Sequence, residues 1–527
     1  MIYIDPPYNT GHDFIYKDDY NDSKRDYLEM NNMDMCSNPN TDGKYHSKWL
    51  NLMYPRLLLS KNLLKNDGII FISIDDNELY NLKKIMDLVY GEDNFIACLP
   101  TVLNLKGNND QFGFSGTHEY TIVYAKNKQA IESINGLEFD DQDIDDYRYE
   151  DAAGKYKKGA TLMRTGQDGF RNKRPKGYYP IYVKPDLSEL STFRMTSDDY
   201  VVYPITKNGV EMSWRRSPEN LEVTKNEFII TKNGDAISFY KKQRLDEDIK
   251  KGKKAKTLFY KPEYSSGNGT TEILKLFGKR VFDNPKPVQL IEDFIRIGTN
   301  DNSNDIVLDF FSGSATTAQA VFKLNTKTKG NRRFILVQCP ERCGKESEAY
   351  KAGYKNICEV GEERIRRAGG QIKADWEKDH PSDTLFSSDE EFPTDIGFKV
   401  FKLDSSNVNE WDNSLELDEK ELAERLGEVF KTDRSKEDIL YEIMLKYGVF
   451  DRQVEDIKIN GKTMYRVGKR YMIVCLEDDI DSSDIKAIGE LSPKTVIFKE
   501  SGFADDNAKL NAVYNLEKAG VEDIKCI

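Results

Sequence analysis

Hydrophobic and polar positions follow two repeating patterns over the first 127 residues. Short, largely apolar runs at 2–4, 69–74 and 118–125 are typical of buried strands. Apolar residues recur at helical spacing in the segments 46–64 and 76–90. Strands that alternate with helices predict an α/β fold with a doubly wound sheet.

The same pattern returns near residue 305 and brackets a turn of small residues. Ile306–Leu308 is expected to be a strand, a Ser-Gly-Ser-Ala turn follows, and a helix begins at Thr317. Small residues let a cofactor lie against the backbone and the helix N-terminus. The turn lacks the Gly-x-x-x-x-Gly-Lys pattern of a phosphate loop, which argues against ATP. Glu341 lies just beyond the next expected strand, 333–338, where an acid would hold a ribose. A nucleoside cofactor bound without a phosphate loop indicates S-adenosylmethionine.

Between these two parts, residues 128–270 change in character. The segment Lys155–Lys184 carries nine Lys and Arg residues against one acid, and Lys241–Lys261 carries nine more. Aromatic residues are interleaved with the first run, and a nucleic-acid groove combines positive charge with planar rings. The alternative is a solvated, irregular surface. We predict contact with double-stranded DNA through Lys155, Lys157, Lys158, Arg171, Lys173, Arg174, Arg215 and Arg216.

Length and composition narrow the possibilities. A chain of 527 residues exceeds one ordinary core, so two to four domains are expected. The formal charge of −13 argues against a uniformly basic surface but not against a local basic face. No apolar run approaches a membrane span, no signal-peptide pattern is present, and the seven cysteines are scattered, which together predict a cytoplasmic protein without disulfides. No cysteine or histidine set has zinc-site spacing, so no metal is predicted.

The opening segment, Met1 to Gly11, carries the candidate chemistry. The strand at 2–4 is followed by Pro6 and Pro7, which cannot donate to a sheet, so Asp5 and Tyr8 are expected at its carboxyl edge, where α/β sheets bind ligands. The amino group of adenine or cytosine is a poor nucleophile because its lone pair is delocalised into the ring. Asp5 and the Pro6 carbonyl can each accept an amino hydrogen while Tyr8 stacks on the base. The alternative is an ordinary polar turn.

This Asp-Pro-Pro-Tyr tetrad resembles the catalytic motif of amino-group DNA methyltransferases. Asp309–Thr317 resembles their Phe-x-Gly-x-Gly methyl-donor motif, and Pro285–Ile291 resembles the segment before it in the β-class. Further segments resemble the modification subunits of type III restriction–modification systems. These segments are 46–50, 75–78, 269–272, 398–405 and 501–506.

The resemblance implies a Rossmann-like methyltransferase sheet in permuted order, with the tetrad before the cofactor loop. It implies adenine-N6 methylation of a specific DNA site, with a homodimer and a restriction subunit as partners. The implied domains are a catalytic half (1–127), a target-recognition region (128–270), a cofactor-binding half (271–372), a linker (373–396) and an assembly domain (397–527). The pattern of the last segment predicts strands at 398–403 and near 472–476 and 495–498, and helices over about 418–430 and 436–447. The expected catalytic residues are Asp5, Pro6, Pro7 and Tyr8. The expected cofactor-binding residues are Lys286, Asp309, Phe311, Gly313, Ser314, Thr316, Thr317 and Glu341.

Two departures from the family pattern leave alternatives open. Ala315 occupies a position that is usually glycine, which is expected to weaken cofactor binding. Met1 falls inside the first strand, so the chain looks shortened and one edge of the cofactor pocket is expected to be open. The shortened N-terminus leaves open a DNA-recognition subunit with impaired catalysis. The amino-group chemistry leaves open a cytosine-N4 methyltransferase and a methyltransferase acting on RNA or protein amides.

Overall fold

A computed structural model describes residues 1–10, 45–107, 113–301, 303–380, 391–409, 429–450 and 452–527. These residues form two compact units, Met1–Phe398 and Lys399–Ile527. Cys36 and nearly all of the helix predicted over 418–430 lie outside the described residues. No helix in the described part is long and apolar enough to cross a membrane.

The first unit is built on a six-stranded sheet with the order β13-β12-β1-β2-β4-β3. β1 pairs in parallel with β12 and with β2, and β12 pairs in parallel with β13. The α/β sheet predicted from the alternating pattern is confirmed. The strands are β1 (Ile2–Ile4), β2 (Ile69–Ile74), β3 (Phe95–Val102), β4 (His118–Ala125), β12 (Ile306–Asp309) and β13 (Arg333–Leu336).

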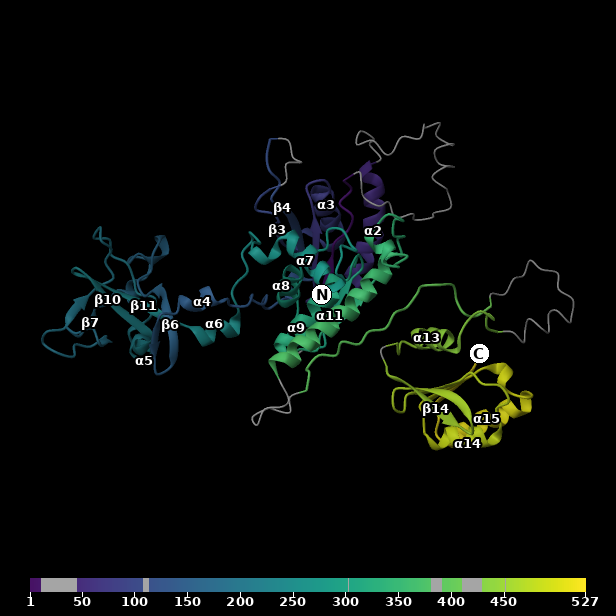
Figure 1. Cartoon of the computed structure of the whole chain (residues 1–527). Coiled ribbons are helices and arrows are strands. Elements are labelled where there is room, and N and C mark those ends of the chain that lie inside the picture. The colour runs from purple at the N-terminus through teal and green to yellow at the C-terminus, as the bar shows by residue number, and fades with distance from the viewer. Residues whose placement is uncertain (11–44, 108–112, 302, 381–390, 410–428, 451) are drawn as a thin grey trace. The chain divides into compact units, whose positions relative to one another are not determined.

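Helices cover both faces of this sheet (Figure 1). Because successive strand side chains point to opposite faces, Ile2 and Ile4 pack with α2 and α3 while Tyr3 packs with α8 and α9. A sheet that is buried on both faces leaves its strand ends as the accessible places for a ligand. The helices are α2 (Tyr45–Leu63), α3 (Leu79–Tyr90), α7 (Ser266–Phe277), α8 (Val288–Gly298), α9 (Thr316–Thr328), α10 (Glu348–Lys351) and α11 (Ile357–Asp379).

The sheet differs from a fully parallel one at one edge. β4 runs antiparallel to both β2 and β3, and no helix connects β3 to β4 among the described residues. Tyr120 near the start of β4 pairs with Ile74 at the end of β2. The first residues of β4 therefore lie at the same edge as the carboxyl ends of β1, β2 and β12.

The region 128–270 contains two small antiparallel sheets, with orders β10-β11-β6-β5 and β8-β7-β9. They share one apolar core, which includes Leu162, Ile181, Trp214 and Phe239. The strands are β5 (Tyr149–Asp151), β6 (Gly154–Thr161), β7 (Ile181–Val183), β8 (Leu190–Ser191), β9 (Tyr200–Val202), β10 (Phe228–Asn233) and β11 (Ala236–Arg244). The helices are α4 (Asp141–Asp145), α5 (Pro218–Thr224) and α6 (Leu245–Lys251).

The second unit is a small α/β module around the five-stranded sheet β14-β15-β16-β17-β18. The helix predicted over 436–447 and the strands predicted near 472–476 and 495–498 are confirmed. The helices are α13 (Lys436–Lys446), α14 (Ser482–Glu490) and α15 (Asp506–Lys518). The strands are β14 (Val454–Ile459), β15 (Lys462–Val467), β16 (Met472–Cys475), β17 (Thr495–Phe498) and β18 (Asp523–Cys526).

One element prediction is wrong. Residues 398–403 alternate in the manner of a strand, but they form none. Val400, Phe401 and Leu403 are exposed instead of facing a core. Alternation alone does not make a strand, because an isolated strand needs a neighbour for its backbone hydrogen bonds.

Candidate functional site

The tetrad follows β1 directly and is held by two segments that come later in the chain. The indole N–H of Trp49, on α2, donates to the Pro7 carbonyl at 2.7 Å. Glu78, fully buried at the start of α3, accepts from the Asn9 amide at 2.5 Å and contacts His46 Nδ1 at 2.7 Å. Two motifs singled out in the sequence, around His46 and Glu78, therefore fix the backbone that carries Asp5 and Tyr8.

Four polar side chains meet beyond the end of β1. We call Asp5, Tyr8, Glu119 and Lys286 the acid–lysine cluster. The Tyr8 hydroxyl lies 2.9 Å from Asp5 Oδ1 and 3.0 Å from Glu119 Oε2. Lys286 Nζ lies 2.6 Å from the Tyr8 hydroxyl, 2.5 Å from Glu119 Oε1 and 3.3 Å from Asp5 Oδ1. The Lys286 ammonium group therefore contacts the carboxylates of both Asp5 and Glu119.

Burial shapes the ionisation of this cluster. The side chains of Glu119 and Lys286 are each 11% exposed. Burial raises the pKa of Glu119, although Lys286 opposes the rise. Burial acts to lower the pKa of Lys286, but Asp5 and Glu119 outweigh it and raise that pKa. Burial and the two carboxylates hold the pKa of Tyr8 well above its usual value, so Tyr8 is neutral. The formal charges of the two carboxylates and the one ammonium group give the cluster one net negative charge.

The small-residue turn after β12, residues 312–315, is held by hydrogen bonds on both sides. Asp309 accepts from the Phe311 N–H at 3.1 Å and from the Thr317 hydroxyl at 2.6 Å. The Gly313 N–H donates at 2.7 Å to the side chain of Gln338, beyond the end of β13. Gly313 has φ +48°, a left-handed conformation that glycine adopts without steric cost. The turn is thus held in one shape before any ligand binds.

A buried arginine supports the same turn from α11. Arg364 is fully buried, and its guanidinium donates at 2.6 Å to the hydroxyls of Ser314 and Thr316 and at 3.0 Å to Gln319. Burial lowers the pKa of Arg364 to about 10, so it remains charged at neutral pH. The hydroxyls of Ser314 and Thr316, two predicted cofactor residues, therefore accept hydrogen bonds from Arg364.

Ala315 is strained within this turn. It has φ +63° and ψ +36°, a left-handed conformation that costs a residue with a Cβ about 1–2 kcal/mol. Ala315→Gly removes this cost but adds chain entropy to the unfolded state, so we expect a net gain of about 0.5–1 kcal/mol in the free energy of unfolding. Differential scanning calorimetry measures it. Ala318→Gly, buried within α9, is the matched control and should destabilise by about 1 kcal/mol. Destabilisation by both changes would contradict the strain.

Asp309 gives the fold a pH dependence. Burial raises its pKa to about 7, because two hydrogen bonds do not offset the lost hydration. A folded-state pKa above the unfolded value means that stability falls as pH rises between about 4 and 7. Asp309→Asn removes the charge, keeps an oxygen that accepts from the Phe311 N–H, and can donate from its NH2 group to the Thr317 hydroxyl oxygen. The difference in unfolding free energy, wild type minus variant, should fall by up to about 4 kcal/mol across that window. Denaturant titrations at a series of pH values measure it, and a constant difference would contradict the assignment.

The tetrad and the turn lie at the ends of neighbouring strands. β1 and β12 pair in parallel through Ile2 and Leu308. Tyr8 and Phe310 both pack against the apolar cluster that contains Phe311. The negative charge of Asp5 also contributes to the raised pKa of Asp309. The predicted catalytic segment and the predicted cofactor segment therefore form one site.

Two predicted residues lie differently from what the sequence suggested. Lys286, expected to bind cofactor, is within the acid–lysine cluster beside the tetrad. Glu341 is half-buried beyond β13, where its backbone pairs with Cys339 and Ile357. Their roles remain predictions.

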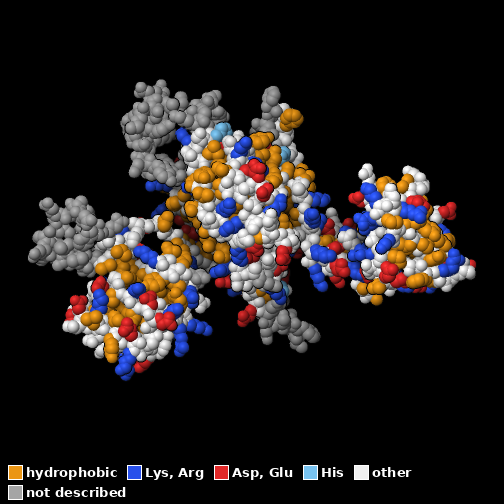
Figure 2. All heavy atoms as spheres, turned by 180° about the vertical axis from the view of Figure 1, so that it is seen from behind, with side chains coloured by type: hydrophobic (Ala, Val, Ile, Leu, Met, Phe, Trp, Pro, Cys, Tyr) orange, Lys and Arg blue, Asp and Glu red, His pale blue; other side chains and the backbone are white. Residues whose placement is uncertain are grey.

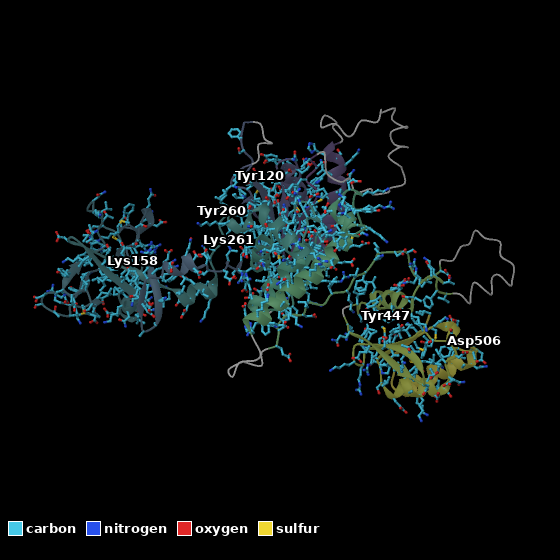
Figure 3. The ribbon with its side chains drawn as sticks, viewed as in Figure 1. Tyr120, Lys158, Tyr260, Lys261, Tyr447 and Asp506 are labelled. Carbon is cyan, nitrogen blue, oxygen red and sulfur yellow. The ribbon has the colours of Figure 1, made fainter. Side chains whose placement is uncertain are left out.

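Sequence reasoning missed Glu119, Gln338 and Arg364. The sequence predicts the strand at 118–125 but not its antiparallel direction, which brings Glu119 to the site. Tyr120, its neighbour, is labelled in Figure 3. Arg364 lies on a helix 47 residues beyond Thr317, and no local pattern marks a side chain that is buried at such a distance. One signal could have identified Glu119. It is an acid near the start of a strand, if that strand is predicted to run antiparallel to its neighbours.

The predicted DNA-binding residues lie on the two small sheets and their loops. Lys158 projects from β6, near the rings of Tyr149 and Tyr240 (Figure 3). Others are already paired with acids: Arg171 with Glu211 at 2.9 Å, and Lys173 with Asp168 at 3.3 Å. On the face in Figure 2, basic and acidic side chains are interspersed. DNA contact by these residues therefore remains a prediction. Arg171 and Lys173 would have to leave their acidic partners to bind phosphate, whereas Lys158 would not.

Comparison with known proteins gives one family match and several relatives. Residues 1–348 match a family described as DNA methylase. The type III restriction-modification enzyme EcoPI Mod subunit of Escherichia phage P1 is 44% identical over 69% of this chain and 58% of its own length. The type II methyltransferase M.KpnI of Klebsiella pneumoniae is 32% identical over 69% of this chain and 81% of its own length. The EcoP15I Mod subunit of Escherichia coli is 29% identical over 95% of this chain and 77% of its own length. The chain thus spans less than two thirds of the EcoPI subunit.

Proposed function

Because the chain belongs to the DNA methylase family, we propose that it transfers a methyl group from S-adenosylmethionine to adenine N6 at a specific site in double-stranded DNA. One observation carries the proposal. Asp5 and Tyr8 lie at the carboxyl end of β1, next to the small-residue turn that follows its parallel neighbour β12. An amine acceptor and a donor site are thereby adjacent.

The chemistry of the site fits this cofactor. S-adenosylmethionine supplies an electrophilic methyl group on a positively charged sulfonium. The acid–lysine cluster carries one uncompensated negative charge, and buried charge of one sign favours a ligand of the opposite sign. The turn at 312–315 is made of small residues and presents backbone instead of bulky side chains. We assign the cofactor to this turn, with Asp309, Phe311, Thr317, Gln338 and Arg364 holding its shape.

The tetrad residues act by positioning the base. An adenine inside a duplex is out of reach, so it must flip out of the stack before Tyr8 can receive it. Asp5 and the Pro6 carbonyl then accept one amino hydrogen each. This moves the nitrogen lone pair out of conjugation with the ring and makes it available to the methyl group. Asp5 Oδ1 keeps its contact with the Tyr8 hydroxyl, so Oδ2 is the oxygen that accepts the amino hydrogen. Cytosine N4 presents the same two hydrogens, and analysis of the methylated nucleosides distinguishes the two products.

The relatives suggest the biological setting. Two of them are named Mod subunits of type III restriction-modification enzymes. We infer that this chain is such a modification subunit, that it forms a homodimer, and that it works with a restriction subunit. The region 128–270 would then select the DNA sequence, and the second unit would serve assembly.

Long-read sequencing of DNA from cells that express this chain tests the function. We expect N6-methyladenine in one sequence motif, and its absence in cells that express the Asp5→Ala variant at the same level. Methylation at cytosine N4 would replace the substrate in the proposal, and unmodified DNA in the presence of folded protein would refute it.

A further inference from the structure

We propose that Glu119 is the final acceptor of the proton that the amino group loses on methylation, and that this proton reaches it from Asp5 through the Tyr8 hydroxyl. The inference rests on the methyl transfer proposed above. It assigns a task to the acid–lysine cluster that base positioning alone does not require.

A continuous chain of oxygen atoms supports the proposal. Asp5 Oδ1, the Tyr8 hydroxyl and Glu119 Oε2 are separated by 2.9 and 3.0 Å, and both are hydrogen-bond distances. A hydroxyl can accept one proton and release another in the same step. This hydrogen-bonded path runs inward from the side chain of Asp5, which is 29% exposed, to that of Glu119, which is 11% exposed. It therefore leads away from the position that the base must occupy.

The reaction creates a proton that needs such a path. The amino nitrogen forms a bond to the methyl carbon, whose bond to sulfur breaks with its electron pair remaining on sulfur. The nitrogen then bears one proton too many, and Asp5, which holds an amino hydrogen, takes it. Asp5 passes this proton to the Tyr8 oxygen, and Tyr8 releases its own proton to Glu119. Asp5 is thereby ionised again, and Tyr8 is neutral at the start and at the end.

Charge balance gives a second, independent reason for Glu119. Asp5, Glu119 and Lys286 sum to one negative charge, which a sulfonium neutralises when it binds. After the transfer the sulfur is neutral, and the proton on Glu119 neutralises the cluster in its place. The buried site thus holds no net charge before or after the reaction. Avoiding an uncompensated charge matters most where burial removes water.

Among the described residues, the groups that act most strongly on Glu119 are Lys286, Asp5 and Tyr8. Lys286, just before α8, contacts Oε1, while Tyr8 and Asp5 follow β1. Asp5 and Glu119 both act on the pKa of Tyr3, and Asp5 acts on that of Asp309. Tyr3 stays neutral because burial raises its pKa strongly. Burial also raises the pKa of Glu119 itself, and a raised pKa favours the carboxyl group as a proton acceptor. Lys286 opposes that rise, because its ammonium group favours the carboxylate form of Glu119.

Isothermal titration calorimetry in two buffers of different ionisation enthalpy tests the proposal without catalysis. S-adenosylmethionine should bind without net proton uptake at neutral pH. S-adenosylhomocysteine, which lacks the positive charge, should bind with uptake of a large fraction of one proton. In Glu119→Gln the uptake should vanish, and the preference for the cationic ligand should fall. Glu132→Gln, an exposed carboxylate elsewhere, is the matched control and should behave as wild type.

Single-turnover methylation over a range of pH completes the test. We expect Glu119→Gln to slow the transfer about 100-fold and to shift the acid limb of the profile to lower pH, while Glu119→Asp restores part of both. Tyr8→Phe should also slow the transfer but leave the proton uptake unchanged. This variant tests the proton path through Tyr8 if Glu119→Gln does not fold. Unchanged uptake and an unchanged profile in an active Glu119→Gln enzyme would overturn the relay yet leave the methyltransferase standing. A wild-type protein that neither binds nor uses the methyl donor would refute the proposed function itself.

Discussion

Replacing Asp5 with alanine is expected to slow methyl transfer to DNA by at least about a thousandfold, which is roughly 4 kcal/mol of lost transition-state stabilisation. Asp5 is the side chain that accepts an amino hydrogen and, in the relay, the first to take the departing proton. Alanine removes both interactions at once. Single-turnover assays with saturating donor and DNA isolate the chemical step, and radiolabelled methyl groups make a thousandfold loss measurable.

Asp5→Asn provides the matched comparison for this prediction. Its amide oxygen still accepts an amino hydrogen, but the charge is gone, so we expect an intermediate loss of about 10- to 100-fold. DNA binding should stay within a few-fold of wild type in both variants, because the predicted DNA contacts lie in 128–270. Near wild-type rates in a folded Asp5→Ala protein would show that the amino group is held by other residues.

The location of the site could be predicted because it depends on local rules. The two prolines after the strand at 2–4 end that strand, because they cannot donate backbone hydrogen bonds. The small residues after Leu308 indicate a ligand loop between a strand and a helix. Both features place side chains at a carboxyl edge without knowledge of the rest of the fold. The structure confirms that the two strands are neighbours. The pairing itself followed from family resemblance, since no local pattern says which strands of a sheet are adjacent.

The supporting residues could not be predicted, because they reach the site from distant parts of the chain. Glu119 arrives through the reversal of β4, and Arg364 arrives through a helix that packs against α9. Each contributes through the contacts of one side chain, which leaves no periodic signal in the sequence. The exposed segment 398–403 shows the converse failure, where a strand-like pattern has no neighbouring strand to pair with.

Gly269→Ala is expected to destabilise the first unit by about 3 kcal/mol and to slow methyl transfer about 100-fold. Gly269 lies on α7, where an added Cβ would meet the Pro285 carbonyl oxygen at 2.1 Å and Lys286 backbone carbon at 3.2 Å. Both contacts are backbone, so no side-chain rotation relieves them. The 285–286 segment must move, and with it the ammonium group that holds Asp5, Tyr8 and Glu119 together. Calorimetry and single-turnover kinetics measure the two effects.

Gly267→Ala, two residues earlier on the same helix, separates this clash from a general effect of alanine. Its Cβ would meet only Ser265 Oγ, at an ordinary 3.7 Å, and alanine is the better helix former. We therefore expect unchanged or slightly raised stability and unchanged kinetics. If Gly269→Ala behaved in the same way, the backbone of α7 would not determine where Lys286 lies. A loss of rate with full stability would instead show that the segment shifts at little cost, and that the reaction depends on the position of the ammonium group more than the fold does.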